Sequence, residues 1–265
     1  MKTGRPCMLS LLMLIFFGSL QAQSPLSVTD YRILPMEMVA VKPFQQMAWV
    51  KLACRNDYFL KELMNAEAEG VMLFGDRHAM VCRLTHDGYA RYGVLNASLG
   101  YALKLGGKFA CGLQYHYMYH HVTQSEALHS ICFDLSLCAQ LSRKIFFAVE
   151  AYNPACLKYG VKGKEVIPLR FTVLMNYAYN EKLLFSVQLF KQLPGKFDVC
   201  LGVFYRPKDF FYLDFSLSLY DADVGVMLRC RSVYFTVDMR YNYNLGCSPQ
   251  VGLLLPIPRI VAKKR

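Results

Sequence analysis

The sequence is poor in charged residues and in long apolar runs, and it contains a single tryptophan. Charged residues make up 18% of its 265 residues, hydrophobic residues make up 54%, and the mean hydropathy is +0.21. A soluble domain carries about 25% charged residues, so this composition is atypical of a water-soluble protein. A helical membrane protein would contain apolar runs of about 20 residues, but the longest run here is Cys7–Leu20. The high apolar content also excludes intrinsic disorder.

The apolar run near the N-terminus has the layout of a secretory signal peptide. Lys2 and Arg5 precede the run, and Ala22 supplies a small residue at the expected cleavage point. Because the run is short for a membrane-spanning helix, a membrane anchor is the less favoured alternative. We therefore predict a signal peptide at residues 1–22, followed by a short periplasmic segment at residues 23–45.

Closely spaced cysteine pairs are also lacking. Nine cysteines follow the predicted signal peptide, and no two of them have the CxxC spacing. Because zinc sites need close pairs of ligands, the cysteines predict no metal site. An odd number of cysteines cannot all form disulfides, and we interpret most of them as small apolar residues on strands.

What the sequence does contain is a long series of segments that alternate with a period of two. In the segment 108–121, Phe109, Leu113 and Tyr117 fall on one face, while Gln114 falls on the other. A helix cannot place residues of this period on one face, so the pattern predicts strands. Fourteen segments alternate in this way, at 46–55, 68–74, 77–85, 92–105, 108–121, 128–141, 144–152, 167–179, 182–191, 196–206, 210–219, 222–230, 232–244 and 247–255.

The two faces of these strands differ in a way that indicates a membrane barrel. One face is large and apolar, with Tyr and Phe near the strand ends, and the other is mixed and polar. An outer-membrane barrel turns its apolar face to lipid, and its closure leaves no unpaired strand edge in hydrocarbon. We predict an all-β, transmembrane, antiparallel up-and-down β-barrel of about 14 strands at residues 46–255, with 12 strands as the fallback. A soluble lipid-binding barrel or an aromatic-rich sandwich is the alternative.

The connections between the strands alternate in length over much of the chain. If the first strand runs outward, every second connection faces the periplasm and is expected to be short. The predicted short connections lie at 75–76, 106–107, 142–143, 180–181, 206–209 and around Arg231, and the longer ones at 56–67, 85–91, 121–127 and 153–168. Towards the C-terminus this asymmetry fades. A basic tail at residues 256–265 follows the last strand.

Charged and histidine side chains on the polar faces are predicted to point into the lumen. Both signs are present, so these side chains can pair across strands, for instance Asp214 with Arg229 or Asp198 with Arg170. This pattern favours a closed, salt-bridged interior, and a narrow selective pore is the alternative. Besides Lys104, the lumen-facing candidates are Lys51, Arg55, His116, His120, Asp134, Glu150, Arg170, Asp198, Arg206, Asp214, Arg229, Asp238 and Arg240.

The same residues give no signature of catalysis. His116 and His120 are four positions apart on a strand, about 13 Å, so they cannot share a metal ion. A hydrolase embedded in the barrel would need one of these histidines beside Ser136 and Asp134, but the sequence contains no GxSxG motif. No phosphate-binding loop or dinucleotide fingerprint occurs either. We predict no catalytic residue, no metal and no cofactor.

The basic excess is interpreted as ordinary solvated loop charge, although a basic outer loop could also meet anionic lipopolysaccharide, and it does not indicate a nucleic-acid partner. Lys158, Lys162 and Lys164 lie in the longest predicted outer loop, but no aromatic stacking platform accompanies them. The predicted partners are outer-membrane lipid and lipopolysaccharide, and nucleic acid is not expected.

Six short motifs occur in a defined order along residues 55–255. They are Phe59–Leu63, Gly93–Lys104, Ala151–Pro154, Ile167-Pro168, Phe204–Pro207 and Tyr243–Gln250. Together they resemble a group of Bacteroidetes outer-membrane barrels similar to the PorV and PorQ components of the type IX secretion system. More remotely, the chain resembles FadL-type transporters of hydrophobic compounds. Both resemblances imply a barrel of 14 strands in the outer membrane.

The resemblance to PorV and PorQ implies a non-enzymatic barrel that docks a secretion-system or surface-protein partner. The FadL-type resemblance implies the alternative, a channel for a hydrophobic small solute, and a lipid hydrolase is the third and least favoured function. The chain departs from the FadL pattern because only residues 23–45 precede the first strand, so a full N-terminal hatch is not expected. It also does not end on the aromatic residue that is common in outer-membrane barrels.

Overall fold

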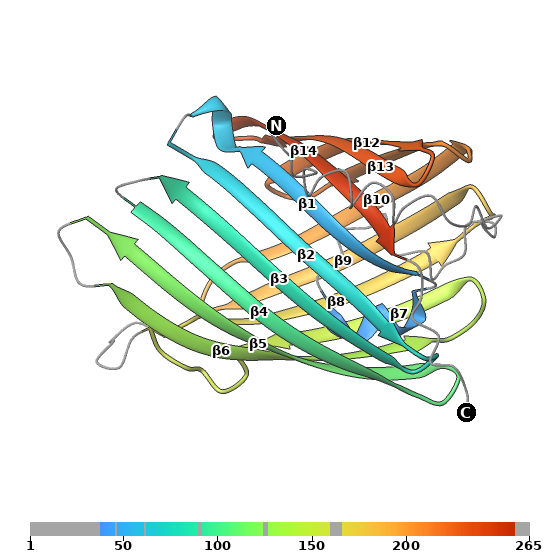
Figure 1. Cartoon of the computed structure of the whole chain (residues 1–265), viewed down its shortest axis with the longest axis horizontal. Coiled ribbons are helices and arrows are strands. Elements are labelled where there is room, and N and C mark those ends of the chain that lie inside the picture. The colour runs from blue at the N-terminus through green and yellow to red at the C-terminus, as the bar shows by residue number, and fades with distance from the viewer. Residues whose placement is uncertain are drawn as a thin grey trace, which may run out of the picture.

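A computed structural model describes residues 38–45, 47–60, 62–89, 92–123, 127–159 and 166–257 of the protein. Fourteen antiparallel strands form one closed barrel in which each strand pairs with its neighbours in sequence and β1 pairs with β14 (Figure 1). The predicted fold class and strand number are therefore confirmed. The strands are β1 (Ala48–Asn56), β2 (Met64–Phe74), β3 (His78–Tyr89), β4 (Tyr92–Leu105), β5 (Phe109–Val122), β6 (Leu128–Gln140), β7 (Ile145–Tyr152), β8 (Leu169–Ala178), β9 (Leu183–Leu193), β10 (Phe197–Lys208), β11 (Phe211–Leu217), β12 (Asp221–Cys230), β13 (Val233–Asn242) and β14 (Gly246–Ile257).

Two of the predicted boundaries near the N-terminus are wrong. Strand β2 begins at Met64 rather than at residue 68, because its first residues pair with the end of β1. Strand β3 continues to Tyr89, which pairs with Tyr92, so the long connection predicted at 85–91 is wrong, and only two residues separate β3 from β4. Gly88 allows this close approach with a φ of 116°, since a side chain there would collide with the carbonyl oxygen of Tyr92.

The connections divide the barrel into two unlike rims. At one rim the connections are the residue ranges 75–77, 106–108, 141–144, 179–182, 209–210 and 231–232, each of two to four residues. We call this the short-turn rim, and the opposite one the long-loop rim. The longest connection at the long-loop rim joins β7 to β8 over residues 153–168. Short connections are thus found at each predicted place, except that the one predicted at 206–209 lies at 209–210 because β10 continues to Lys208. The opposite rim also has short connections, between β3 and β4 and beyond β8.

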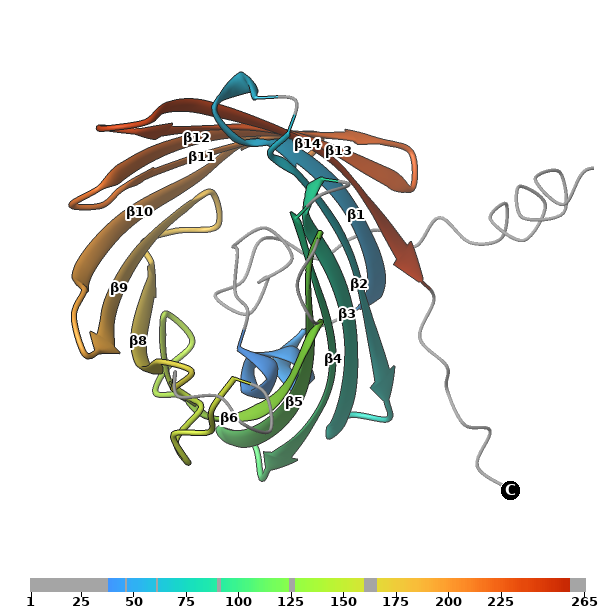
Figure 2. The same ribbon diagram turned by 90° about the vertical axis from the view of Figure 1, so that its left-hand side faces the viewer.

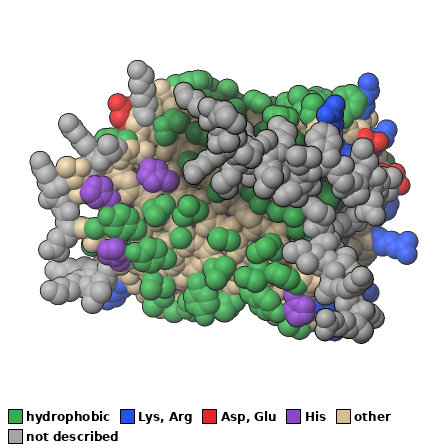
Figure 3. Space-filling view, viewed as in Figure 1, with side chains coloured by type: hydrophobic (Ala, Val, Ile, Leu, Met, Phe, Trp, Pro, Cys, Tyr) green, Lys and Arg blue, Asp and Glu red, His purple; other side chains and the backbone are tan. Residues whose placement is uncertain are grey.

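Side chains alternate between lumen and exterior along each strand. Leu137 is 58% exposed on the outer face, whereas its neighbour Ser136 is 3% exposed and points inward. Apolar side chains are spread over the visible outer wall, and the charged side chains in view gather towards its two ends (Figure 3). A barrel with its apolar face outward and its polar face inward is suited to lipid rather than to water.

A short segment ahead of β1 lies inside the barrel. The 3-10 helix η1 (Val39–Phe44) and the preceding Met38 are buried, and they pack against β2 to β6 (Figure 2). We call Met38–Phe44 the plug. These residues belong to the segment expected in the periplasm, and the structure instead places them in the lumen. Strand β14 continues to Ile257, so the basic tail predicted at 256–265 begins two residues too early. The rest of that tail and the predicted signal peptide lie outside the described residues.

Within the described ranges, no helix is long and apolar enough to span a membrane.

Candidate functional site

The plug rests in a cradle of small wall residues. A Cβ atom on Gly112 would lie 2.7 Å from the Ala40 nitrogen, and one on Gly100 would lie 2.8 Å from a methyl group of Val39. The backbone N–H of Ala40 donates to the Ser136 hydroxyl at 3.0 Å. Strands β4, β5 and β6 therefore hold the plug at van der Waals distance, because their inward positions carry little or no side chain.

An ionic network anchors the plug to β2. The ammonium group of Lys42 donates to a Glu69 carboxylate oxygen at 2.9 Å, and both side chains are 3% exposed. Arg83 also binds Glu69 at 2.9 Å and lies 3.5 Å from Glu67, which binds Lys51 at 3.0 Å. Burial lowers the pKa of Lys42 below its usual value, and the nearby Glu69 carboxylate offsets only part of this shift. Because a buried charge is costly when its partner is lost, this network fixes the position of the plug.

Aromatic contacts hold the end of the plug that points towards the short-turn rim. The rings of Phe44 and Phe146 meet edge to face at 5.6 Å, and Lys104 lies 4.4 Å from the centre of the Phe44 ring. The indole N–H of Trp49 donates to the Gln45 side chain at 2.9 Å. These contacts hold the Phe44 end of the plug and the residue that follows it.

Beside the plug, the lumen contains a cavity of about 460 Å³. Six acidic and six basic side chains line it. Neutral side chains fill the positions between these charges, including Thr172, Leu174, Ser186, Gln188, Phe190, Cys200, Met227, Thr236 and Gln250. Of the charged residues predicted to face the lumen, seven line the cavity: Lys51, Arg55, Glu150, Arg170, Asp214, Asp238 and Arg240.

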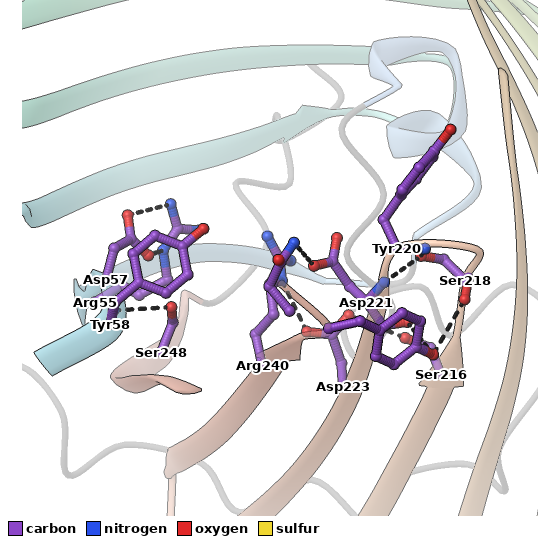
Figure 4. Close-up of polar contacts among 12 residues, drawn as sticks. Arg55, Asp57, Tyr58, Ser216, Ser218, Tyr220, Asp221, Asp223, Arg240 and Ser248 are labelled. Carbon is purple, nitrogen blue, oxygen red and sulfur yellow. Dashed lines mark hydrogen bonds and ion pairs between the residues drawn. The ribbon is translucent and has the colours of Figure 1, made fainter. Parts of the chain in front are cut away.

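Polar contacts across neighbouring strands organise the part of the lumen drawn in Figure 4. Arg240 binds Asp223 at 2.8 Å, and the Ser216 hydroxyl donates to the same carboxylate group at 3.2 Å. Arg55 binds Asp57 at 2.7 Å in the connection after β1. These contacts pair Arg55 and Arg240 with carboxylates of the barrel itself.

Three other predicted residues gather beneath the connection between β7 and β8 and do not line the cavity. His116 lies 2.9 Å from the Asp134 carboxylate, and its ring meets Tyr152 edge to face. His120 meets Tyr159 in the same way at 5.2 Å.

The remaining three predicted residues lie near the rims and also outside the cavity lining. Asp198 accepts the backbone N–H of Leu219 at 3.0 Å. Arg206 donates to the Glu181 carbonyl at 3.2 Å, and Arg229 donates to the carbonyl of Arg231 at 3.2 Å.

Both ion pairs suggested by the sequence are wrong. Asp214 lies opposite Gly225, four positions along β12 from Arg229, a separation of about 13 Å. Asp198 is on β10 and Arg170 is on β8, with β9 between them. The strand register, which the sequence alone did not reveal, decides which charges meet.

Of the three groups named for a hydrolase, His116 and Asp134 are in contact, but Ser136 is not brought to them. The Ser136 hydroxyl accepts the Ala40 N–H, and Ser136 lies opposite Gly112, four positions along β5 from His116. Among the described residues, no group of three or more His, Cys, Asp or Glu is placed to hold a metal ion.

Five further charged residues line the cavity that the sequence pattern did not indicate: Lys42, Glu67, Glu69, Arg83 and Asp223. The alternation of Glu67 and Glu69 with alanine and glycine was a usable signal, but the predicted start of β2 at residue 68 divided it. Lys42 gave no signal, because it lies outside the period-two segments.

No protein-family model matches the chain, and no curated protein matches its sequence. Among solved structures, the chain is similar to the CymD monoaromatic hydrocarbon channel, with a TM-score of 0.55 and 11% identity over 90% of this chain and 95% of that chain. It is also similar to a TodX deltaS2S3 mutant monoaromatic hydrocarbon channel, with a TM-score of 0.54 and 9% identity over 83% and 92% of the two chains. The KdgM porin gives a TM-score of 0.49 and 8% identity over 79% and 99%. The chain therefore has the fold of outer-membrane β-barrel channels, while the relationship to PorV and PorQ stays a prediction.

Proposed function

We propose that this protein is a non-enzymatic outer-membrane channel for a small solute, which the plug keeps closed at rest. The observation that carries the proposal is a lumen divided between a tightly held plug and a cavity of about 460 Å³. Cavities of about 300 to 1,000 Å³ accommodate small molecules. The printed names of two similar barrels, both monoaromatic hydrocarbon channels, support transport as the activity.

The proposed barrel spans the outer membrane with its short-turn rim towards the periplasm. Its exposed apolar band contacts lipid, and lipopolysaccharide surrounds the long-loop rim. A solute enters the cavity from the long-loop rim and passes once the plug moves, because the plug fills the lumen beside β2 to β6.

The cavity wall determines which solutes are suited to this channel. A pure hydrocarbon would displace water from twelve charged side chains without replacing any of its hydrogen bonds. The solute is therefore polar or amphipathic, and in this respect the proposal differs from the hydrocarbon channels that share the fold.

The test compares the full chain with a variant that lacks the plug, residues 38–44, in planar bilayers and in osmotically loaded vesicles. We expect small conductance and slow swelling for the full chain, and a clear increase of both for the variant. Protein-free bilayers give the baseline. Equal conductance of the two proteins would contradict the proposal, provided that both migrate as folded barrels in unheated gels.

Docking of a secretion-system or surface-protein partner is the second candidate function. Apolar side chains are exposed in the connections of the long-loop rim, among them Phe59, Leu60, Leu219, Tyr220 and Leu245. Such side chains, together with the motifs that resemble PorV and PorQ, support a partner at this rim. A deletion strain is expected to lose particular surface or secreted proteins, and an unchanged surface and secreted proteome would exclude this function.

A further inference from the structure

Every connection of the short-turn rim contains or adjoins a basic side chain. Five of the six connections contain a lysine or an arginine, and Lys208, the last residue of β10, adjoins the sixth at 209–210. We call these basic residues the basic crown: Arg77, Lys108, Arg143, Lys144, Lys182, Lys208 and Arg231. All of them are exposed. In Figure 3, basic side chains project from the end of the wall that carries the short turns.

The basic crown carries more positive charge than its neighbours neutralise. Only three acids, Asp76, Glu181 and Asp209, lie in the same connections. Among the described side chains, none forms an ion pair or a hydrogen bond with the charged group of a crown residue. The Lys208 ammonium group instead lies 5.7 Å from the centre of the Phe210 ring. The short-turn rim therefore presents net positive charge to its surroundings.

The crown follows the rim as a band and is not concentrated at one point. Successive short connections are two strands apart, about 10 Å measured across the strands. The Debye length at physiological ionic strength is about 8 Å, so the fields of neighbouring crown residues overlap. A band of positive potential thus extends around the rim from β2 to β13. Such a band is suited to a layer of many small anions rather than to one bound ion.

Exposed apolar side chains on the outer wall set the depth of the crown. Each crown residue lies within three residues of one of them: Phe74, Phe109, Leu141, Tyr179, Phe210 and Leu228. Aromatic and large apolar side chains at the rim of a membrane barrel mark the edge of the hydrocarbon. A connection of two to four residues extends no more than about 7 Å beyond the strand ends. The polar layer on each side of the hydrocarbon is about 5 to 8 Å thick, so the crown lies among the lipid headgroups.

This depth favours a lipid over a protein as the partner of the crown. A soluble acidic protein would have to enter the headgroup layer, because the short turns do not project beyond it. An anionic phospholipid already holds its phosphate group at this depth. Lysine and arginine side chains close to a membrane surface are attracted to anionic lipids.

From these observations we propose that the basic crown binds anionic phospholipids of the leaflet at the short-turn rim, with its side chains donating hydrogen bonds to the phosphate oxygens. The proposal rests on the proposed function only in that the barrel spans a membrane, and in the proposed orientation this leaflet is the periplasmic one. It requires neither transport nor movement of the plug. It assigns a lipid class to one rim of the barrel, which the fold does not specify.

Electron spin resonance of spin-labelled lipids measures which lipids contact the barrel. The full chain is reconstituted in phosphatidylcholine vesicles with a trace of spin-labelled phosphatidylglycerol, or of spin-labelled phosphatidylcholine as the reference. We expect phosphatidylglycerol to associate about two-fold or more tightly than phosphatidylcholine. In 1 M salt the Debye length falls to about 3 Å, so this ratio is expected to approach one. Equal association of the two lipids at low salt would overturn the proposal.

Matched triple variants locate the preference on the barrel. The crown triple replaces three lysines of the short-turn rim: Lys108→Gln, Lys144→Gln and Lys182→Gln. The control triple replaces three exposed lysines at or near the long-loop rim: Lys158→Gln, Lys191→Gln and Lys196→Gln. We expect the preference for phosphatidylglycerol to fall in the crown triple and to remain in the control triple. An equal fall in both would overturn the assignment to the crown. The salt series on the unmodified protein remains decisive if a variant does not insert.

Two further outcomes separate this proposal from its alternatives. Polyglutamate that binds the inserted barrel but not the crown triple, without any lipid preference, would assign the crown to an acidic protein and overturn the proposal. Bilayer conductance of the full chain tests the proposed function independently. A lipid preference in a barrel that never conducts would support the crown and count against the channel, whereas conductance without a lipid preference would do the reverse.

Discussion

Single positions without a side chain determine what the lumen holds. Gly100 and Gly112 make room for the plug, and Gly225 makes room for two carboxylates. In each case the space that a side chain would fill is occupied by a group from a different element. The wall of a barrel has few inward positions per strand, so each such space has a large effect on the interior.

Replacement of Gly112 by alanine is expected to loosen the plug. The added methyl group would lie 2.7 Å from the Ala40 nitrogen and 2.8 Å from the Ser136 hydroxyl oxygen, and such overpacking costs about 1 to 3 kcal/mol. Maleimide labelling followed by mass spectrometry checks this, because the buried Cys138 thiol donates to the Ala40 carbonyl at 2.9 Å. We expect faster labelling of Cys138 in the variant. Gly107→Ala is the control, since open space surrounds Gly107, and equal labelling of both variants would contradict the cradle.

Replacement of Glu69 by glutamine is expected to release the plug more strongly. It removes the carboxylate of a buried ion pair and leaves Lys42 without that partner, which costs about 3 to 5 kcal/mol. Single-channel recording checks the prediction as an increase in open time. The control is Glu181→Gln, an acid in a short turn whose side chain lies outside the network. Unchanged open time in Glu69→Gln would show that packing alone holds the plug.

At the level of the strand, the side chains on the outer face determine how stable the barrel is in the membrane. Leu135 lies near the middle of β6 and is 47% exposed on the lipid side. Leu135→Arg is expected to destabilise the inserted barrel by about 2 to 4 kcal/mol, because a charge at mid-depth is most costly. Urea titration in lipid vesicles measures the change. The matched variant Leu105→Arg, beside a short turn, is expected to cost about 1 kcal/mol or less, and equal costs would contradict the assigned depth.

The strands were predictable from the sequence because most outward positions carry an apolar residue, a choice that lipid imposes on every strand. The closed barrel then followed from the need to pair both edges in hydrocarbon. The plug was not predictable, because Val39–Phe44 has the composition of a strand but no period of two. Ion pairs were predicted less well than strands, because a pair such as Arg240 with Asp223 depends on register between strands.

At the scale of the whole molecule, two groups of strands have different roles. Strands β2 to β6 hold the plug, while β8 to β14 supply much of the cavity wall. Substitutions in the second half can change solute preference without loosening the plug. Substitutions in the first half affect closure.

This division predicts two separate unfolding transitions in urea. The plug is held by one short segment, whereas the wall is held by a closed ladder of backbone hydrogen bonds, so the plug is expected to detach first. Trp49, the only tryptophan, contacts Lys42 of the plug and donates a hydrogen bond to Gln45 directly after it, so its fluorescence reports detachment. Far-ultraviolet circular dichroism reports the strands. Glu69→Gln is expected to shift only the first transition, and coincident transitions would contradict an independently held plug.

The position of the plug also determines an order of events during biogenesis. It immediately precedes β1, and most of its contacts are with β2 to β6. Its other ring contacts are with Trp49 of β1 and Phe146 of β7, which also belong to the first half of the strands. A partly assembled sheet of these strands is still open, and the plug can settle on its concave side before β14 arrives. Pairing of β1 with β14 then closes the ring around a segment already in place. A plug added to a finished ring would instead have to thread through a narrow lumen, so supplying it as a separate peptide is a poor substitute for encoding it ahead of the first strand.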